Sequence, residues 1–247
     1  MLRNVNGDYS RDVPEPDYDA LVNEYNNQAQ NETTSVNNQP RNLSKTQYGF
    51  TTQNINGVEM RVYNDPIGTS QLLIQQQGCS EFDMQGTCGL CQCSNLLTLA
   101  GVQNSTEDTI ISSALHCSDN VIDCMDIFHP YSHERGGTSA RDRREILEQN
   151  GLSTYYLPVS IFRRETVKEL AESVQTGHGV IVSVDIARLW KNGMSGGHAI
   201  SLLSVTEDGS TFIYSDTGRG EINTISANDL ASALSGRPAN ITTNIIR

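Results

Sequence analysis

The stretch QGTCGLCQCSNLLTLAG, residues 85–101, decides the predicted fold. Apolar residues recur in it at the spacing of one helical face, at Leu90, Cys93, Leu96, Leu97 and Ala100. Gly101 is typical of a helix end, so we predict a helix whose N-terminus lies at or just after Cys88 and Gly89. The positive end of a helix dipole favours a thiolate over a thiol, which makes Cys88 a candidate nucleophile.

In the rest of the globular region, the predicted helices mostly come before the predicted strands along the chain. After an early strand at residues 58–63, helices are predicted to start at 105–108 and to cover 138–151 and 164–177. Alternating apolar residues then predict strands at 179–185, 198–205 and 211–216. This order indicates an α+β fold in which the cysteine helix packs against an antiparallel sheet.

A thiol nucleophile needs a base, and the base needs an acceptor that orients it. His198 begins an apolar strand after two glycines, and Asp216 ends the next strand. A hairpin that turns at Glu207–Gly209 brings the start of the first strand close to the end of the second, if the register slips slightly. The sequence therefore predicts a Cys88–His198–Asp216 site.

These motifs resemble a known family. GTCGLCQCSNLLTLAG is similar to the nucleophile segment of the papain-like peptidases that process bacteriocins in ABC transporters, where a Cys-Gly pair precedes a helix. The later Gly-His-apolar strand and the Asp before a turn match His198 and Asp216. The resemblance is closer still to papain-like domains that end bacterial polymorphic toxins, which share a GGTS-x-x-x-R helix start, here at 136–143.

A second register gives a different nucleophile. QGTCGLC also matches the papain pattern Gln-Gly-x-Cys-Gly-x-Cys, in which Cys91 is the nucleophile and Gln85 donates to the oxyanion. An aromatic residue follows the papain nucleophile, whereas Gln92 follows Cys91. In the Cys88 register, the residue six positions before the nucleophile is Phe82 rather than glutamine. We prefer Cys88, with Gln85 as an oxyanion donor in either register.

Several other side chains have alternative interpretations. The loop at 116–137 contains Cys117, Cys124, His129 and His133, which could bind zinc together with Cys88 and Cys91, or contain a Cys117–Cys124 disulfide. Their spacing is not that of a standard zinc finger, so we predict no metal and no cofactor. Trp190 is interpreted as a core anchor, a wall of the substrate cleft, or both, and Arg141–Arg144 as a solvated helix face.

Composition restricts the partners. The 247 residues carry a formal net charge of −12, which argues against nucleic acid and against an anionic membrane surface. No apolar run is long enough to span a bilayer, and the N-terminus lacks the hydrophobic stretch of a signal peptide. Residues 1–55 are rich in Asn and Gln, so we expect a linker or leader, such as a translocation-associated segment, before a catalytic domain at 56–247.

The residues and the resemblance together predict a cysteine hydrolase that cleaves peptide bonds. Deamidation or acyl transfer by the same site, and a zinc-stapled binding module without catalysis, remain alternatives. The resemblance implies the C-terminal effector of a secreted interbacterial toxin of the contact-dependent growth inhibition type, delivered into the cytoplasm of a target cell. It also implies a protein or peptide substrate and a cognate immunity protein as partners.

Overall fold

The computed structural model describes residues 50–55, 58–63, 75–102, 104–115, 135–191 and 193–243. Residues 1–49 of the predicted linker or leader (1–55) lie outside the described residues. The last six residues of that segment form strand β1 (Phe50–Ile55), which pairs with β2 (Val58–Tyr63) in a separate two-stranded antiparallel sheet. In the described part of the chain, no helix is long and apolar enough to cross a membrane.

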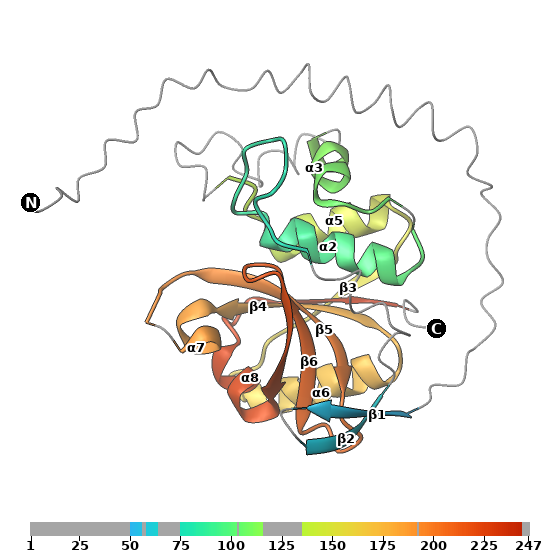
Figure 1. Cartoon of the computed structure of the whole chain (residues 1–247), viewed down its shortest axis with the longest axis vertical. Helices are drawn as coiled ribbons and strands as arrows, with labels where there is room; N and C mark the ends of the chain where they lie inside the picture. Colours follow the sequence, from blue (N-terminus) through green and yellow to red (C-terminus); the bar gives the residue numbers. More distant parts are fainter. Residues whose placement is uncertain are drawn as a thin grey trace, which may run out of the picture.

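A six-stranded antiparallel sheet forms the centre of the fold (Figure 1). Its strands are β3 (Thr154–Leu157), β4 (Gly179–Asp185), β5 (Gly197–Val205), β6 (Thr211–Asp216), β7 (Glu221–Ser226) and β8 (Ala239–Thr242). They lie in the order β3-β8-β4-β5-β6-β7. The last strand of the chain therefore lies between β3 and β4, and only β4 to β7 follow one another both in sequence and in the sheet.

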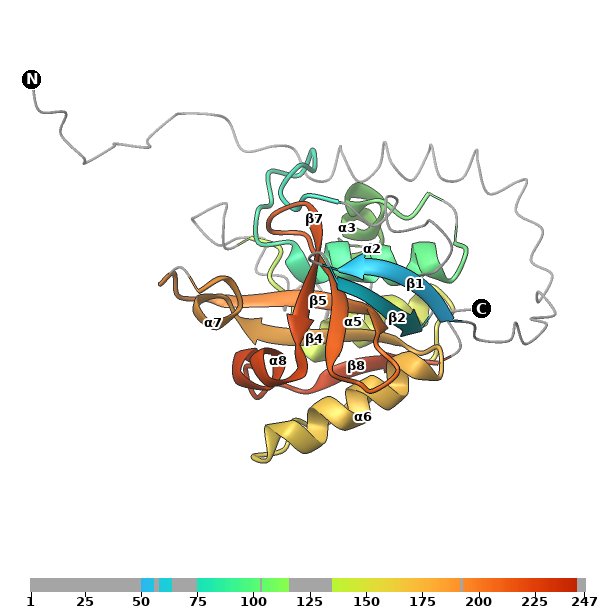
Figure 2. The ribbon, with the colours of Figure 1, turned by 60° about the horizontal axis from the view of Figure 1, so that its bottom comes forward.

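Helices cover the sheet in two groups, which the two ribbon views separate (Figures 1 and 2). The first group is α2 (Cys88–Leu99), α3 (Glu107–Leu115) and α5 (Ala140–Gln149). The second is α6 (Arg163–Gln175) and α8 (Ala227–Ala233), and the short α7 (Ile186–Trp190) directly follows β4.

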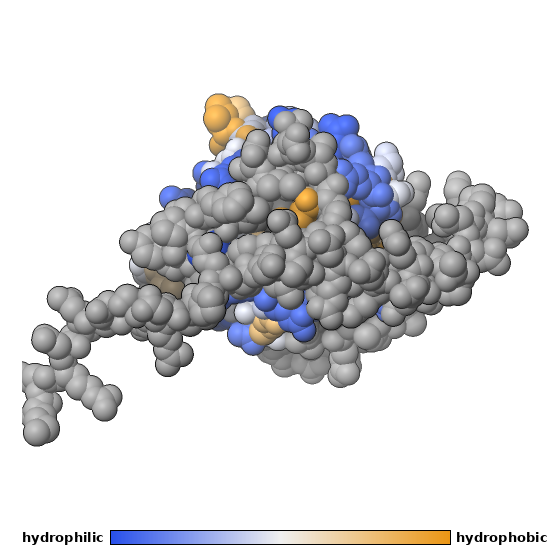
Figure 3. All heavy atoms as spheres, turned by 90° about the horizontal axis from the view of Figure 1, so that it is seen from above, coloured by the Kyte–Doolittle hydropathy of each residue, from blue (hydrophilic) through white to orange (hydrophobic). Residues whose placement is uncertain are grey.

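The core consists of two clusters because strand side chains alternate between the faces of the sheet. On β4, Val180, Val182 and Val184 belong to the cluster that includes the buried face of α6. Ile181 belongs to the other cluster, with the apolar residues of α2, α3 and α5. On the face seen from above, the described residues that reach the surface are mostly hydrophilic, and apolar ones form small separate patches (Figure 3).

Local sequence signals set the helix ends as predicted. Ser139 caps α5 by accepting from the backbone N–H groups of Arg141 and Asp142, and the Asp142 carboxylate accepts from the backbone N–H of Ser139. Gly101, Gly151 and Gly177 follow helices with φ between 82° and 85°, the left-handed conformation that glycine adopts without strain. The predicted α+β class, with the cysteine helix packed on an antiparallel sheet, is confirmed.

Candidate active site

Cys88 is the first residue of α2, is half-buried, and lines a cleft of about 730 Å³. His198, at the start of β5, lines the same cleft and is 6% exposed. Gly196 and Gly197 also line it, so the backbone before His198 is open to a bound molecule. The structure thus brings together the cysteine and the histidine that the sequence singled out.

Two glycines let the segment before α5 pack against the start of α2. A Cβ atom at Gly89 would lie 1.8 Å from Thr138 Oγ1, and one at Gly136 would lie 2.6 Å from Thr87 Cγ2. Gly136 also has a φ of +82°, and the backbone N–H of Gly86 donates to the Arg135 carbonyl at 2.8 Å. The Cys-Gly pair and the GGTS segment are therefore one packing unit that positions Cys88.

A buried carboxylate holds the loop that leads into α2. Glu107, the first residue of α3, is 7% exposed. Its two oxygens accept from the backbone N–H groups of Gly78 at 2.8 Å and Cys79 at 3.1 Å, and one of them also accepts from the Thr87 hydroxyl. Because Thr87 directly precedes Cys88, Glu107 couples α3 to the position of the thiol.

The β5–β6 hairpin contains a β-bulge that the sequence did not predict. Leu202 pairs with Tyr214 but Ser204 pairs with Ile213, so β5 has one extra residue. If the register of Leu202 and Tyr214 is extended along the strands, His198 lies opposite Gly218. Asp216 is on the same face of the sheet as Gly218, because strand residues that are two positions apart point to the same face. Without the bulge, the side chain of Asp216 would point to the other face of the sheet.

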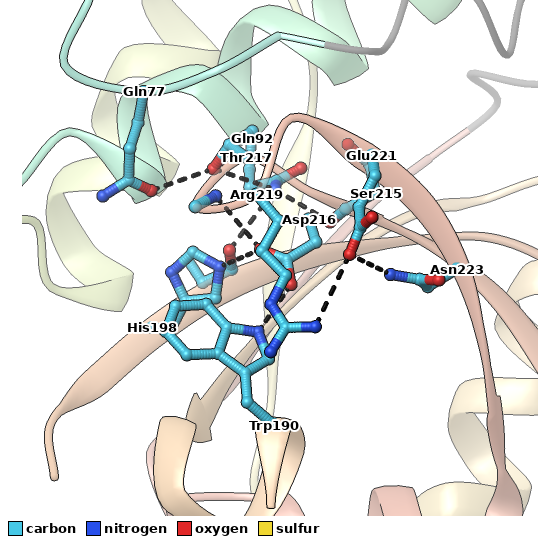
Figure 4. Close-up of polar contacts among 12 residues, drawn as sticks. Gln77, Gln92, Trp190, His198, Ser215, Asp216, Thr217, Arg219, Glu221 and Asn223 are labelled. Atoms are coloured by element: carbon cyan, nitrogen blue, oxygen red, sulfur yellow. Dashed lines mark hydrogen bonds and ion pairs between the residues drawn. The ribbon is translucent and has the colours of Figure 1, made fainter. Parts of the chain in front are cut away.

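The Asp216 carboxylate is buried and accepts three N–H donors (Figure 4). His198 Nε2 lies 2.8 Å from Oδ1, the Gly218 N–H lies 3.0 Å from Oδ1, and Trp190 Nε1 lies 2.7 Å from Oδ2. Trp190 therefore orients Asp216, and its ring is 5.5 Å from the His198 ring. It does not line the cleft, so of its two predicted roles the structure supports the packing role.

A buried polar seam keeps α2 in register with the hairpin. Gln92 Nε2 donates to the carbonyls of Ser215 at 3.0 Å and Ala199 at 3.3 Å. Asn95 Nδ2 donates to Ser215 Oγ at 3.0 Å and to Gln92 Oε1 at 3.1 Å. Gln92 and Asn95 are both fully buried, so these bonds fix the cysteine helix against the strands that carry His198 and Asp216.

The electrostatics of the site favour a thiolate beside an imidazolium. Burial raises the pKa of Cys88, but the hydrogen bond and charge of His198, with smaller effects of the Ala199 N–H and Arg143, lower it below its ordinary value. Burial lowers the pKa of His198, yet the hydrogen bonds to Asp216 and Cys88 raise it to about 9. The pKa of Asp216 is lowered despite burial, chiefly by the bond from His198.

Cys91 has a different environment from Cys88. It is fully buried, it does not line the cleft, and burial together with the charge of Glu107 raises its pKa well above the ordinary value. A buried thiol of this kind is a poor nucleophile. The geometry therefore favours Cys88 over Cys91.

The structure places Gln77 at the cleft, where the sequence had suggested Gln85. The side chain of Gln85 is exposed and packs against Gly78, and Gln85 does not line the cleft. Gln77 does, and both ends of its amide are held: Nε2 donates to the Gln85 carbonyl at 3.0 Å, and Oε1 accepts from Thr217 Oγ1 at 3.2 Å (Figure 4). No spacing rule indicates Gln77, because a long loop separates it from Cys88.

The interpretation of Arg141–Arg144 as a solvated face is wrong at Arg143. This residue is 2% exposed, and its guanidinium donates to neutral oxygens of Asn240, Thr138 and Ser183. It lies near the end of α5 that faces the cleft and lines the cleft itself. The helical pattern could not predict the burial of Arg143, because its hydrogen-bond partners Ser183 and Asn240 come from β4 and β8.

The remaining candidate residues, Cys117, Cys124, His129 and His133, fall outside the described part of the chain. The two alternatives for them, a zinc site and a Cys117–Cys124 disulfide, fall outside it as well. The four described cysteines, at 79, 88, 91 and 93, are free thiols. Within the described ranges, no three His, Cys, Asp or Glu side chains gather as metal ligands would.

Comparisons with known proteins give similarity at the level of structure. No family model matches the sequence, and no curated protein matches it. One similar solved structure is described as a C39-like peptidase from Bacillus anthracis, with a TM-score of 0.47 and 12% identity over 70% of this chain and 95% of that chain. Another is the Pseudomonas avirulence protein AvrPphB, with a TM-score of 0.32 and 14% identity over 63% of this chain and 89% of that chain.

Proposed function

We propose that the chain is a papain-like cysteine hydrolase with Cys88 as nucleophile, His198 as proton carrier and Asp216 as the group that orients His198. The observation that carries the proposal is the 2.8 Å bond between His198 Nε2 and Asp216 Oδ1, because His198 lines the same cleft as Cys88. It leaves Nδ1 as the ring nitrogen for the hydrogen bond to Cys88. A thiol at a helix N-terminus, paired with an oriented imidazole, has what nucleophilic catalysis requires.

The chemistry follows from this pairing. The Cys88 thiolate attacks the carbonyl carbon of a peptide bond, and the π electrons of the carbonyl move to its oxygen. When the tetrahedral intermediate collapses, the carbon–nitrogen bond breaks and His198 Nδ1 gives its proton to the leaving amine. The neutral imidazole then takes a proton from water, whose oxygen attacks the thioester and releases the acid and the thiolate.

Two donors are placed for the oxyanion. The backbone N–H of Cys88 is one of the first N–H groups of α2, which have no acceptor within a helix. Gln77 Nε2 has a second N–H that no described residue accepts. A donor fixed before the reaction stabilises developing charge without reorganisation, so we assign Gln77 to the role that Gln85 was predicted to fill.

Exposure of a peptide mixture to the protein tests the proposal. We expect new N-termini, identified by mass spectrometry, with the wild type and with Cys79→Ser, which alters an exposed thiol that does not line the cleft. Cys88→Ser should produce none. Release of ammonia without new N-termini would assign the same site to deamidation, and equal cleavage by the wild type and Cys88→Ser would refute the proposal.

The sequence resemblance supports a biological role for this hydrolase. We propose that it is the effector of an interbacterial toxin, neutralised by an immunity protein and active in the cytoplasm of the target cell. Expression of the wild type in a bacterial cytoplasm should then slow growth, whereas Cys88→Ser should not. Growth that is equal for the two proteins would remove the support for a toxin.

A further inference from the structure

The cleft beside Cys88 is rich in arginine, although the chain as a whole is acidic. Four arginines line it, and they come from α5, from the start of α6, from α7 and from the segment between α8 and β8: Arg143, Arg163, Arg188 and Arg237. The whole chain carries a formal net charge of −12. Because exposed charges are screened over roughly 8 Å at physiological salt, the local arginines set the potential inside the cleft.

None of these arginines forms a salt bridge within the described part of the chain. Each of the four lacks a carboxylate oxygen within 4.0 Å among the described residues. Arg163 and Arg188 instead donate to one neutral acceptor, the Ser232 carbonyl, at 3.2 and 2.9 Å. The single carboxylate among the described cleft-lining residues, Asp185, caps α7 by accepting from the Ala187 N–H at 2.9 Å.

Arg143 shows that the site is built rather than incidental. A guanidinium that is 98% buried costs free energy unless its donors are satisfied, and Arg143 uses three of them on Asn240, Thr138 and Ser183, at 2.9 to 3.2 Å. These bonds fix a permanent positive charge that acts on the Cys88 thiol. Arg163, Arg188 and Arg237 are half-buried or exposed, so their charged groups are accessible to a ligand.

We infer that this cleft binds an acidic peptide segment, with Asp or Glu side chains placed on the arginines and the scissile carbonyl placed at Cys88. The inference rests on the proposed function and names its substrate class. Guanidinium groups bind carboxylates with two parallel hydrogen bonds, which gives recognition as well as attraction. A cleft of about 730 Å³ is within the range of sites that enclose a small ligand, so it accommodates a few residues of the substrate at a time.

Paired alkylating reagents test the charge of the cleft without a known substrate. Iodoacetate and iodoacetamide differ mainly in charge, and Cys79, an exposed free thiol, serves as an internal reference in the same peptide map. We expect the iodoacetate-to-iodoacetamide rate ratio to be higher at Cys88 than at Cys79, and to fall as salt is added. Arg163→Gln and Arg237→Gln should each lower this ratio by about two- to tenfold, because each removes one positive charge from the lining of the cleft.

Arg164→Gln is the matched control, because Arg164 is the next residue of α6 and does not line the cleft. It should leave the ratio at Cys88 unchanged. The peptide part of the inference needs a second measurement, which is protection of Cys88 from iodoacetamide by short capped peptides of equal length. A Glu-rich peptide should slow alkylation more than a Gln-rich or Lys-rich one, and Arg163→Gln should weaken that protection.

The outcomes separate the two proposals. If neither reagent labels Cys88 faster than Cys79, the proposed function fails. If iodoacetamide labels Cys88 rapidly but the reagent ratio equals that at Cys79, the hydrolase stands and the acidic-substrate inference is overturned. If iodoacetate is favoured but the Glu-rich peptide protects no better than the others, the cleft takes small anions only, and the inference of a peptide ligand is likewise overturned.

Discussion

Substitution of Asp216 by asparagine tests how the site is held together. The carboxylate accepts from His198 Nε2 and Trp190 Nε1 through different oxygens. An amide has one acceptor oxygen and one NH₂ group, so in Asp216→Asn one of these two N–H donors faces another donor. The variant therefore removes the negative charge beside the imidazole, and it also removes either the bond from His198 or the bond from Trp190.

The size of the effect follows from the pKa of His198. Burial lowers this pKa, but Asp216 and Cys88 raise it from 6.5 to about 9, a net preference for imidazolium of about 3 kcal/mol. A hydrogen bond to a charged group contributes about 1.5–3 kcal/mol, so we assign about half of the preference or more to Asp216. In Asp216→Asn the His198 pKa should fall by about one to two units. The Cys88 pKa should rise, because a neutral imidazole no longer stabilises the thiolate.

The assay follows the pH dependence of the Cys88 thiolate, by its ultraviolet absorbance and by its rate of alkylation. The midpoint for thiolate formation should move to higher pH in Asp216→Asn by about one unit. Asp208→Asn is the control, because Asp208 lies in the turn at the other end of the β5–β6 hairpin and bonds only to turn residues. An unchanged midpoint in Asp216→Asn would refute the role of Asp216.

Three further predictions concern other parts of the site. First, the alkaline limb of kcat/KM should lie near pH 9. The imidazolium of His198 is present below its raised pKa and is lost as the pH rises through that value. An alkaline limb near pH 6.5 would contradict this assignment. Second, Gln77→Ala should lower kcat by about a hundredfold with little change in KM, and by more than Gln85→Ala does; the reverse order would assign the oxyanion to Gln85. Third, Glu107→Gln should lower the free energy of unfolding by about 1–3 kcal/mol in urea titrations, because an amide NH₂ group then faces backbone N–H donors. An unchanged urea midpoint would show that the loop before α2 does not depend on the carboxylate.

Local patterns predicted the elements that carry the chemistry. Helical periodicity and a terminal glycine were enough to place Cys88 at the start of α2, and strand alternation was enough to place His198 and Asp216 on neighbouring strands. These signals depend on residues a few positions apart, which is why they survive in the folded chain.

Features that depend on distant segments could not be predicted. The bulge in β5, which puts Asp216 on the face of His198, leaves no mark in the alternation of apolar residues. Burial of Arg143 depends on Asn240 and Ser183, which are far from it in sequence. Gln77 reaches the cleft because its loop bonds to the Thr217 segment, and the backbone N–H of Gln77 donates to the Thr217 carbonyl at 2.9 Å.

The most direct test of the central claim is iodoacetamide labelling near neutral pH, mapped peptide by peptide, on the wild type and on His198→Ala. We predict that Cys88 is alkylated far faster than the other cysteines and loses this advantage in the variant, since the imidazole lowers the pKa of its thiol. Cys91 should react slowly in both proteins, because it is buried and its pKa is raised. Equal and slow labelling of Cys88 in the two proteins would contradict a thiolate–imidazolium pair and, with it, the proposed hydrolase.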